Sequence, residues 1–200
     1  MKNLLVYLVL LIVLLSCSKS GSDNGQEKYP YYFTANINGS SVKYEANDID
    51  SRYECGISMP SSSQGFTDYD IYEGTLIQDG LDDTKNNIYV HILKYFNHEP
   101  SVQEREAMLK MGSYGYGVSK TSSATVNGAS INYTDGTGKS WHSELGSQAG
   151  SSFNITEISD NPDGTSGKIF KASFSCKLYD GSGGVIQVNN AVIRGKIFNP

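Results

Sequence analysis

The chain has 200 residues, of which 18% are charged and 38% hydrophobic, and its formal net charge at pH 7 is −5. Positive and negative residues are interspersed without a basic stripe, which argues against a nucleic-acid partner. Beyond the first 16 residues no stretch is long and apolar enough to span a bilayer. The remaining chain is long enough for one domain with a sizeable core.

The first residues have the organisation of an export signal. Lys2 provides a positive start, and residues 4–15 are apolar without interruption. A helix of that length rises only about 18 Å, too little for a hydrocarbon core of about 30 Å, so it indicates a signal peptide rather than a spanning helix. It ends in Leu-Leu-Ser-Cys at residues 14–17, which resembles the lipobox of bacterial lipoproteins. We therefore expect cleavage after residue 16 and acylation of Cys17.

A polar tether is expected after the cysteine. Residues 18–28 contain no apolar side chain, so they cannot bury enough surface to fold. With the acylated Cys17 they make a tether over residues 17–28, with an end-to-end distance of about 18 Å. Several acyl chains on one cysteine make a lasting membrane anchor. Residues 29–200 form the single predicted β-domain.

The domain shows mostly period-two alternation with Gly, Asn and Asp between the runs, which predicts strands and hairpins. The first run covers residues 31–37. Asn38-Gly39 follows, and because both residues tolerate positive φ it predicts a two-residue hairpin turn. Further strands are predicted at 42–44, 53–59, 71–78, 88–96, 170–178, 185–188 and 191–198, with the last two as a closing hairpin.

One short helix is predicted near residues 101–111. Ser101 and Glu104 have the spacing of a capping box, and Gly112 suits a left-handed helix stop. The fold class is therefore all-β, an antiparallel β-sandwich with one helix. A lipocalin-like β-barrel is the alternative, but uneven strand lengths and the interrupting helix favour the sandwich.

Two segments of the chain resemble each other. Residues 35–44 and 124–133 share five of ten positions, and both contain Asn-Gly at the centre. This similarity predicts a second hairpin at Asn127-Gly128. It leaves open whether two hairpins converged or one was duplicated.

Two cysteines remain after Cys17. Cys55 shares its predicted strand face with Tyr53 and Ile57, and Cys176 shares its face with Phe174. Both faces are apolar, and an exported domain can form disulfides. We therefore predict a Cys55–Cys176 disulfide across the core, with two separate buried thiols as the alternative.

The second half of the chain resembles small surface lipoproteins of Bacteroidota. The likeness rests on residues 126–133, Asp135-Gly136, Trp141, Gln148, Ser152-Phe153 and residues 174–181, together with the opening at 33–39. Those proteins are β-rich domains, mostly of unknown function. The resemblance implies a lipid-anchored location at the outer membrane, facing the periplasm or the cell surface. It supplies no catalytic residue.

The sequence offers no catalytic, metal or cofactor motif. No Ser lies in G-x-S-x-G, and Pro100 after His98-Glu99 excludes the helical H-E-x-x-H zinc motif. His91 lies in a predicted central strand, where a structural role is expected. Two acidic turns, at residues 79–83 and 160–163, lack EF-hand spacing and indicate solvated loops.

Aromatic residues are the one compositional excess. The chain has 14 Tyr, 7 Phe and 1 Trp. Tyr114 and Tyr116 lie in a Gly-rich segment, and Trp141 follows another, so we expect these three rings to be exposed and to stack against a ligand.

These observations favour a membrane-anchored, non-catalytic binding or adhesion module for a glycan or a protein. A β-barrel carrier of a small apolar ligand is the second hypothesis, and it requires an interior pocket. A glycan hydrolase with two carboxylates is the third, and it requires such a pair about 5–9.5 Å apart in a cleft.

Overall fold

The computed structural model describes residues 31–46, 53–58, 69–77, 84–96, 98, 101, 103–104, 107–121, 124–160 and 168–197. The predicted signal peptide, Cys17 and the tether lie outside these ranges. In the described part of the chain, no helix has the length and apolar character needed to cross a membrane.

The N-terminal hairpin forms as its sequence pattern predicts. β1 (Tyr31–Ile37) buries alternate residues, and β2 (Ser40–Ala46) pairs with it along its whole length. Asn38 and Gly39 have φ values of 49° and 86°, the left-handed conformation that a two-residue turn needs at both central positions.

The structure adds eleven strands and one short 3₁₀ helix, η1 (Ser143–Leu145). The strands are β3 (Tyr53–Ser58), β4 (Tyr69–Ile77), β5 (Asn87–Tyr95), β6 (Gly112–Tyr114), β7 (Val118–Thr121), β8 (Ala124–Val126), β9 (Gly128–Thr134), β10 (Ser140–His142), β11 (Ser152–Asp160), β12 (Lys168–Tyr179) and β13 (Val185–Ile197).

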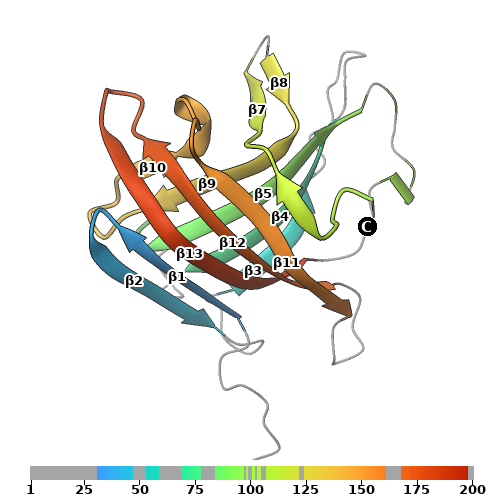
Figure 1. Ribbon diagram of the computed structural model, residues 1–200, viewed down its shortest axis with the longest axis horizontal. Coiled ribbons are helices and arrows are strands. Elements are labelled where there is room, and N and C mark those ends of the chain that lie inside the picture. The colour runs from blue at the N-terminus through green and yellow to red at the C-terminus, as the bar shows by residue number, and fades with distance from the viewer. Residues whose placement is uncertain are drawn as a thin grey trace, which may run out of the picture.

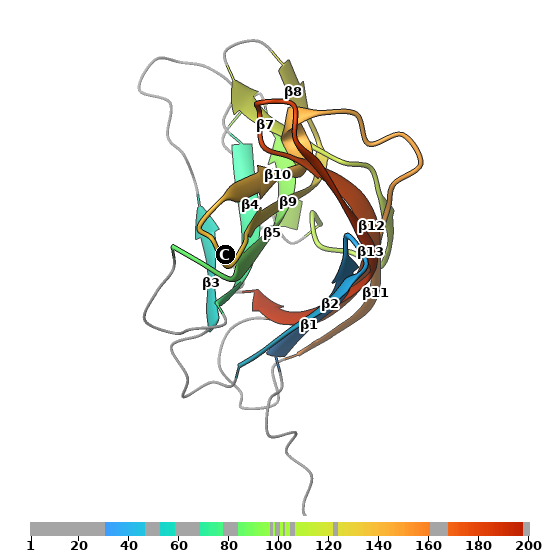
Figure 2. The same cartoon turned by 90° about the vertical axis from the view of Figure 1, so that its left-hand side faces the viewer.

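One large antiparallel sheet contains most of these strands (Figure 1). Its order is β2-β1-β13-β12-β10-β9-β5-β4-β3, and β11 pairs with both β12 and β6. The sheet folds over so that β13 packs against β4 and β3, which creates two layers (Figure 2). Among the described strands β2 and β3 end the path without pairing with each other, so the sheet is open and the fold is the predicted all-β sandwich rather than a barrel.

Stacked aromatic rings fill the interior between the layers. Phe174 lies 6.2 Å from Phe33 and 5.6 Å from Phe153, both in stacked orientation, and Tyr44 packs against Phe33 at 5.7 Å. These side chains come from β1, β2, β11 and β12, and each is at least 95% buried. The apolar side chains of β12 therefore face the core, as the alternation in its sequence predicts.

Two predicted hairpins are corrected by the structure. The residues of the expected C-terminal hairpin form the single strand β13, in which a bulge absorbs Asn189 and Asn190 without a chain reversal. Asn127-Gly128 is a corner rather than a hairpin turn, because β8 pairs with β7 whereas β9 pairs with β5. The similarity of residues 35–44 and 124–133 is thus not a similarity of fold.

The predicted helix near 101–111 lies partly outside the described residues. Its capping box is present: Ser101 N donates to Glu104 Oε2 at 2.9 Å, and Glu104 N donates to Ser101 Oγ at 3.3 Å. One helical hydrogen bond follows, from Ala107 N to Gln103 O at 3.0 Å. The described part of this segment contains no helix that is longer than this single turn.

A side chain bridges a fork in the sheet beside β12. On one side, β12 pairs with β11 up to Ser175 and with β10 only at Tyr179, so Lys177 has no strand neighbour there. Gln148 fills the gap: its Nε2 donates to Lys177 O at 2.7 Å, and its Oε1 accepts from Lys177 N at 3.1 Å. The amide of Gln148 therefore replaces a missing residue of a neighbouring strand.

Candidate functional site

Turns from separate parts of the chain gather at one end of the sandwich, which we call the braced end (residues 38–39, 84–86, 135–139 and 180–184). The turns at residues 38–39, 135–139 and 180–184 lie at the left of Figure 1. Asn38 N donates to Gln187 O at 3.0 Å, and Gln187 N donates to Asn38 Oδ1 at 2.9 Å, which joins the first hairpin to β13. Asn86 N donates to Asp135 O at 3.3 Å. The turns are therefore fixed relative to one another.

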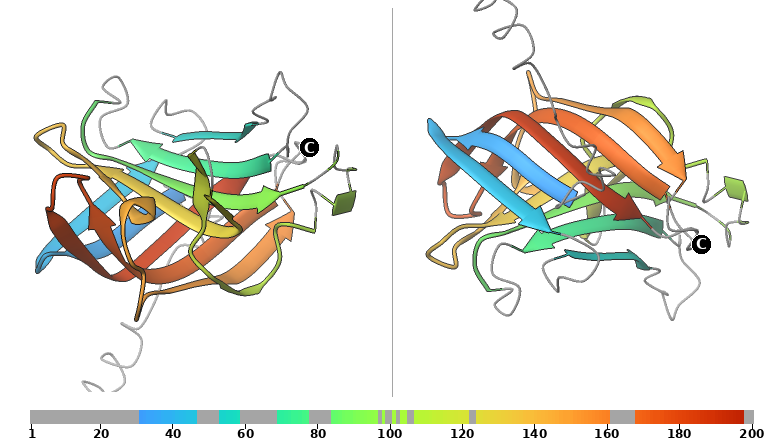
Figure 3. Two further views of the ribbon diagram at one scale, coloured as in Figure 1. Left: turned by 90° about the horizontal axis from the view of Figure 1, so that it is seen from above. Right: turned by 90° about the horizontal axis from the view of Figure 1, so that it is seen from below.

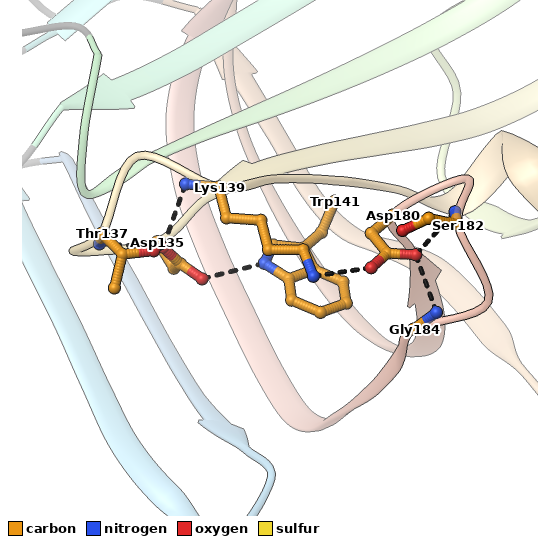
Figure 4. Close-up of polar contacts among 7 residues, drawn as sticks. All are labelled: Asp135, Thr137, Lys139, Trp141, Asp180, Ser182 and Gly184. Atoms are coloured by element: carbon orange, nitrogen blue, oxygen red, sulfur yellow. Dashed lines mark hydrogen bonds and ion pairs between the residues drawn. The ribbon is translucent and has the colours of Figure 1, made fainter.

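Asp135 organises the turn between β9 and β10 (Figure 4). Its Oδ1 accepts from the backbone N of Thr137 and of Lys139 at 2.8 and 3.1 Å, and its Oδ2 accepts from Trp141 Nε1 at 3.0 Å. Burial raises the pKa of this carboxyl, but the hydrogen bonds from Thr137, Trp141 and Lys139 outweigh it and hold the pKa below its usual value. Asp135 is therefore an anionic support for the turn and for the indole.

Lys139 joins this turn to the β12–β13 turn. Its Nζ lies 2.6 Å from Asp180 Oδ2 and 4.3 Å from the centre of the Trp141 ring. Asp180 Oδ1 accepts from the backbone N of Ser182 and Gly184 at 2.9 and 2.7 Å. The Asp180 side chain is only 4% exposed, and the ion pair with Lys139 together with these hydrogen bonds lowers its pKa. Because both oxygens of the Asp180 carboxylate have partners, the ion pair holds the β12–β13 turn in one geometry.

Trp141 is not the exposed ring that its sequence context predicts. It lies in β10 opposite Tyr133, is only 8% exposed, and has the Lys139 ammonium over its ring. A ligand could stack on this indole only after Lys139 had moved away. The glycines that precede Trp141 serve the turn, since Gly138 has a φ of 85°.

Tyr114 and Tyr116 are likewise held by the fold. Both are half-buried, and their rings approach Phe153 edge-on at 6.1 and 6.5 Å. The Tyr114 hydroxyl lies within hydrogen-bond distance of the backbone oxygens of Met108 and Lys110, and the Tyr116 hydroxyl lies within hydrogen-bond distance of those of Ser175 and Ser152, so each has an acceptor for its one proton. Burial raises the pKa of both phenols. The three rings predicted to bind a ligand are thus not presented on one exposed surface.

The glycines around Tyr116 have a structural reason. Gly117 N donates to Ala129 O at 2.7 Å, and Ala129 N donates to Gly115 O at 2.8 Å. A Cβ on Gly128 would lie 2.3 Å from Gly115 O, so the two chain segments cross at a distance that only glycine permits. The crossing marks the base of the β7–β8 hairpin, which projects from the sandwich (Figure 1).

The predicted Cys55–Cys176 disulfide is not formed. Cys176 is a free, fully buried thiol, and burial raises its pKa to about 12. Its thiol lies beside the Tyr116 hydroxyl. The side chain of Cys55 lies outside the described residues, and its strand β3 packs against β13 rather than β12. Apolar alternation placed Cys176 in the core correctly but did not determine which strand it faces.

The sequence predictions did not include a polar row on the outer face of the layer that contains β5 and β9. His91 on β5 is directly opposite Ser130 on β9, and Ser130 Oγ donates to Glu144 of η1. Next to this row, His142 Nδ1 and Asn132 Oδ1 lie 2.9 Å apart. Ser130 has no exposed surface, so its hydroxyl is inaccessible to a substrate and serves the attachment of η1 to the sheet.

The described residues contain no group of three or more His, Cys, Asp or Glu placed to hold a metal ion. Of the two acidic turns, only Asp160 is described, and it pairs with Lys168 across the β11–β12 hairpin. Comparison with protein family models, curated protein sequences and solved structures finds no match to this chain.

Proposed function

We propose that this protein is a non-catalytic binding module, anchored to the outer membrane through acylated Cys17, whose braced end contacts a glycan or protein ligand. The observation that carries this proposal is the position of the braced end relative to Tyr31, the first described residue. The chain enters β1 at Tyr31, and β1 ends at the braced end, where the Asn38-Gly39 turn lies (Figure 3). β1 spans about 23 Å at 3.3 Å per residue, so the braced end is directed away from the anchored terminus.

Two exposed apolar side chains border the braced end. Leu145 and Val185 are 53% and 51% exposed. Leu145 lies over Gly181 of the β12–β13 turn, and Val185 is the first residue of β13 after that turn. Because the turns are already joined by Lys139 and Asp180, little conformational entropy would be lost when a ligand binds.

The stacked interior favours this function over that of a carrier. A carrier needs an interior space for its ligand, whereas the rings of Phe33, Phe153 and Phe174 stack between the layers. A glycan hydrolase would need a carboxylate pair facing a cleft. At the braced end Asp135 and Asp180 instead accept hydrogen bonds from their own turns.

Site-specific photo-crosslinking in cells tests the proposed contact surface. A photo-reactive residue at Leu145 or Val185 should form the same adduct, with a protein or a glycan. A probe at Val126, which is 47% exposed and lies at the opposite end of β9 from the Asp135 turn, should not. The adduct formed from Val185 should disappear when Leu145→Asp is added. If the adducts are absent, or if all three positions yield the same one, the proposed role of the braced end is wrong.

The anchor is tested separately. Cys17→Ser should leave the signal uncleaved and prevent labelling with radioactive palmitate, because the lipobox cysteine is both the acylated residue and the new amino terminus. A Cys17→Ser protein that is still processed and still sediments with membranes would contradict the lipid anchor.

A further inference from the structure

The outer face of the layer formed by β2, β1, β13, β12 and β11 carries a row of side chains in continuous register. From β2 to β11 the row is Glu45, Tyr32, Arg194, Lys171 and Glu157, each directly opposite the next. This face is the right-hand wall of the sandwich in Figure 2. Along the row, a carboxylate is therefore followed by an aromatic ring, two cations and a second carboxylate.

The two central cations are an unfavourable choice for the sheet alone. Lys171 and Arg194 lie directly opposite each other on neighbouring strands, a position in which like charges destabilise a sheet. Glu157 Oε1 lies 2.9 Å from Lys171 Nζ and raises the pKa of Lys171, whereas Arg194 lowers it. The contact with Glu157 outweighs the repulsion, so Lys171 is held as a cation beside Arg194.

The next row places the hydroxyls of Thr34 and Ser173 beside these cations. The whole row, again in direct register from β2 to β11, is Lys43, Thr34, Val192, Ser173 and Asn154. Lys43 pairs with Glu45 at 2.7 Å. Over the two rows the three cations exceed the two carboxylates, although the whole chain has a net charge of −5. The middle of this face is therefore locally positive and carries hydroxyl and amide groups around one tyrosine ring.

We propose that Tyr32, Arg194 and Lys171 form a binding site for an acidic polysaccharide, one that carries carboxylate or sulfate groups. The anionic group would lie between Arg194 and Lys171, and Arg194 can bind a carboxylate or sulfate through two parallel N–H donors. An adjacent sugar ring would stack on Tyr32, and its hydroxyls would face Thr34 and Ser173. The site is distinct from the braced end, and it assigns the protein a second contact surface and a ligand class.

The test compares polysaccharides that share a backbone and differ in charge. The purified full-length mature protein in detergent is titrated with polygalacturonate and its methyl ester, and with dextran sulfate and dextran. We expect at least one acidic polymer to bind, and its neutral counterpart to bind at least tenfold more weakly. Lys171→Ala and Arg194→Ala should each weaken binding about tenfold, as expected for loss of one charge-assisted hydrogen bond in partly exposed surroundings.

Two variants serve as controls. Lys177→Ala removes a cation from the same strand and face, six residues along β12 and about 20 Å away, and should leave the affinity unchanged. Arg194→Lys keeps the charge but loses the paired donors, so its affinity should lie between those of the parent and Arg194→Ala. The sole tryptophan, Trp141, reports by its emission whether each variant is folded.

Several outcomes would overturn the proposal. One is that neither acidic polymer binds, and another is that Lys177→Ala weakens binding as much as Lys171→Ala, which would indicate net charge alone. In a third, the protein binds phosphatidylglycerol vesicles but neither acidic polymer, and Lys171→Ala abolishes the vesicle binding. This face would then contact a membrane surface. None of these results affects cross-linking at Leu145 and Val185, which tests the braced end independently.

Discussion

Gln148 offers a quantitative test of how the sheet is held together at its fork. Its side chain makes two hydrogen bonds to Lys177 in β12, and it also donates to Ser143 O at 2.7 Å and accepts from Ser151 Oγ at 2.9 Å. Gln148→Ala removes all four at once. It leaves the backbone N–H and C=O of Lys177 without the partners that replace a strand.

The magnitude follows from these bonds. Each hydrogen bond contributes about 0.5–1.5 kcal/mol net, and an unsatisfied buried backbone group costs about 1–3 kcal/mol. Water can reach part of this site, because Gln148 is only partly buried. We therefore expect Gln148→Ala to lower the free energy of unfolding by about 2–4 kcal/mol.

Urea denaturation followed by Trp141 emission measures this change. The matched control is Gln103→Ala, an exposed glutamine outside the sheet, for which we expect a change within about 0.5 kcal/mol. Gln148→Glu gives a second readout. Its carboxylate would face the oxygens of Lys177 and Ser143, which favours the protonated form and raises its folded pKa.

The stability of Gln148→Glu should accordingly be highest below the unfolded pKa of about 4.3 and fall as the pH rises above it. If Gln148→Ala costs less than about 1 kcal/mol, or if Gln148→Glu shows no such pH dependence, the bridging role of this side chain is refuted.

Three further predictions concern other parts of the fold. Gly128→Ala should lower the free energy of unfolding in urea by at least about 2 kcal/mol, because the φ of Gly128 is 149° and the added Cβ would meet backbone atoms. Gly112→Ala should lower it less, because Gly112 has a φ of 119° but open space around the added Cβ. Equal losses in the two variants would contradict the close crossing at Gly128. Cys176 should resist Ellman's reagent in the native protein and react in urea, since burial raises its pKa to about 12; rapid native reaction would argue against its burial. Hydrogen bonds from the backbone and side chain of Ser101, and one from His98, lower the pKa of Glu104 to about 2, so the cap should stabilise the fold above pH about 4.3 and be lost as the pH falls toward 2. In Ser101→Ala the backbone N–H and His98 remain but the hydroxyl is lost, so NMR titration should show a Glu104 pKa that is higher than in the parent and still below about 4.3; an unchanged value would refute the part played by the hydroxyl.

Local sequence patterns predicted the elements whose structure depends on neighbouring residues. The β1–β2 hairpin follows from alternation around Asn38-Gly39, because these two residues accept the left-handed backbone that the turn requires. The Ser101–Glu104 cap follows from a three-residue spacing, because at that distance each side chain reaches the backbone N–H of the other residue. Alternation also identified the buried face of β12, since side chains on a strand point to opposite faces in turn.

The candidate site could not be predicted in this way. Glycines near Tyr116 and Trp141 suggested exposed rings, but those glycines serve a chain crossing and a turn. Whether an aromatic ring is open depends on what lies over it, and for Trp141 that is Lys139, which Asp180 holds from a turn about 40 residues further along the chain.

By itself the sequence determined the all-β fold class and the buried face of β12, because strand amphipathicity depends on alternation between neighbouring residues. Only the tertiary structure decided that β13 is one bulged strand, that Cys176 faces Tyr116, and that Gln148 completes the sheet. It also decided that Lys171 lies opposite Arg194. Each of these depends on which strand lies beside which, and strand order follows from packing between segments far apart in the chain rather than from any local pattern.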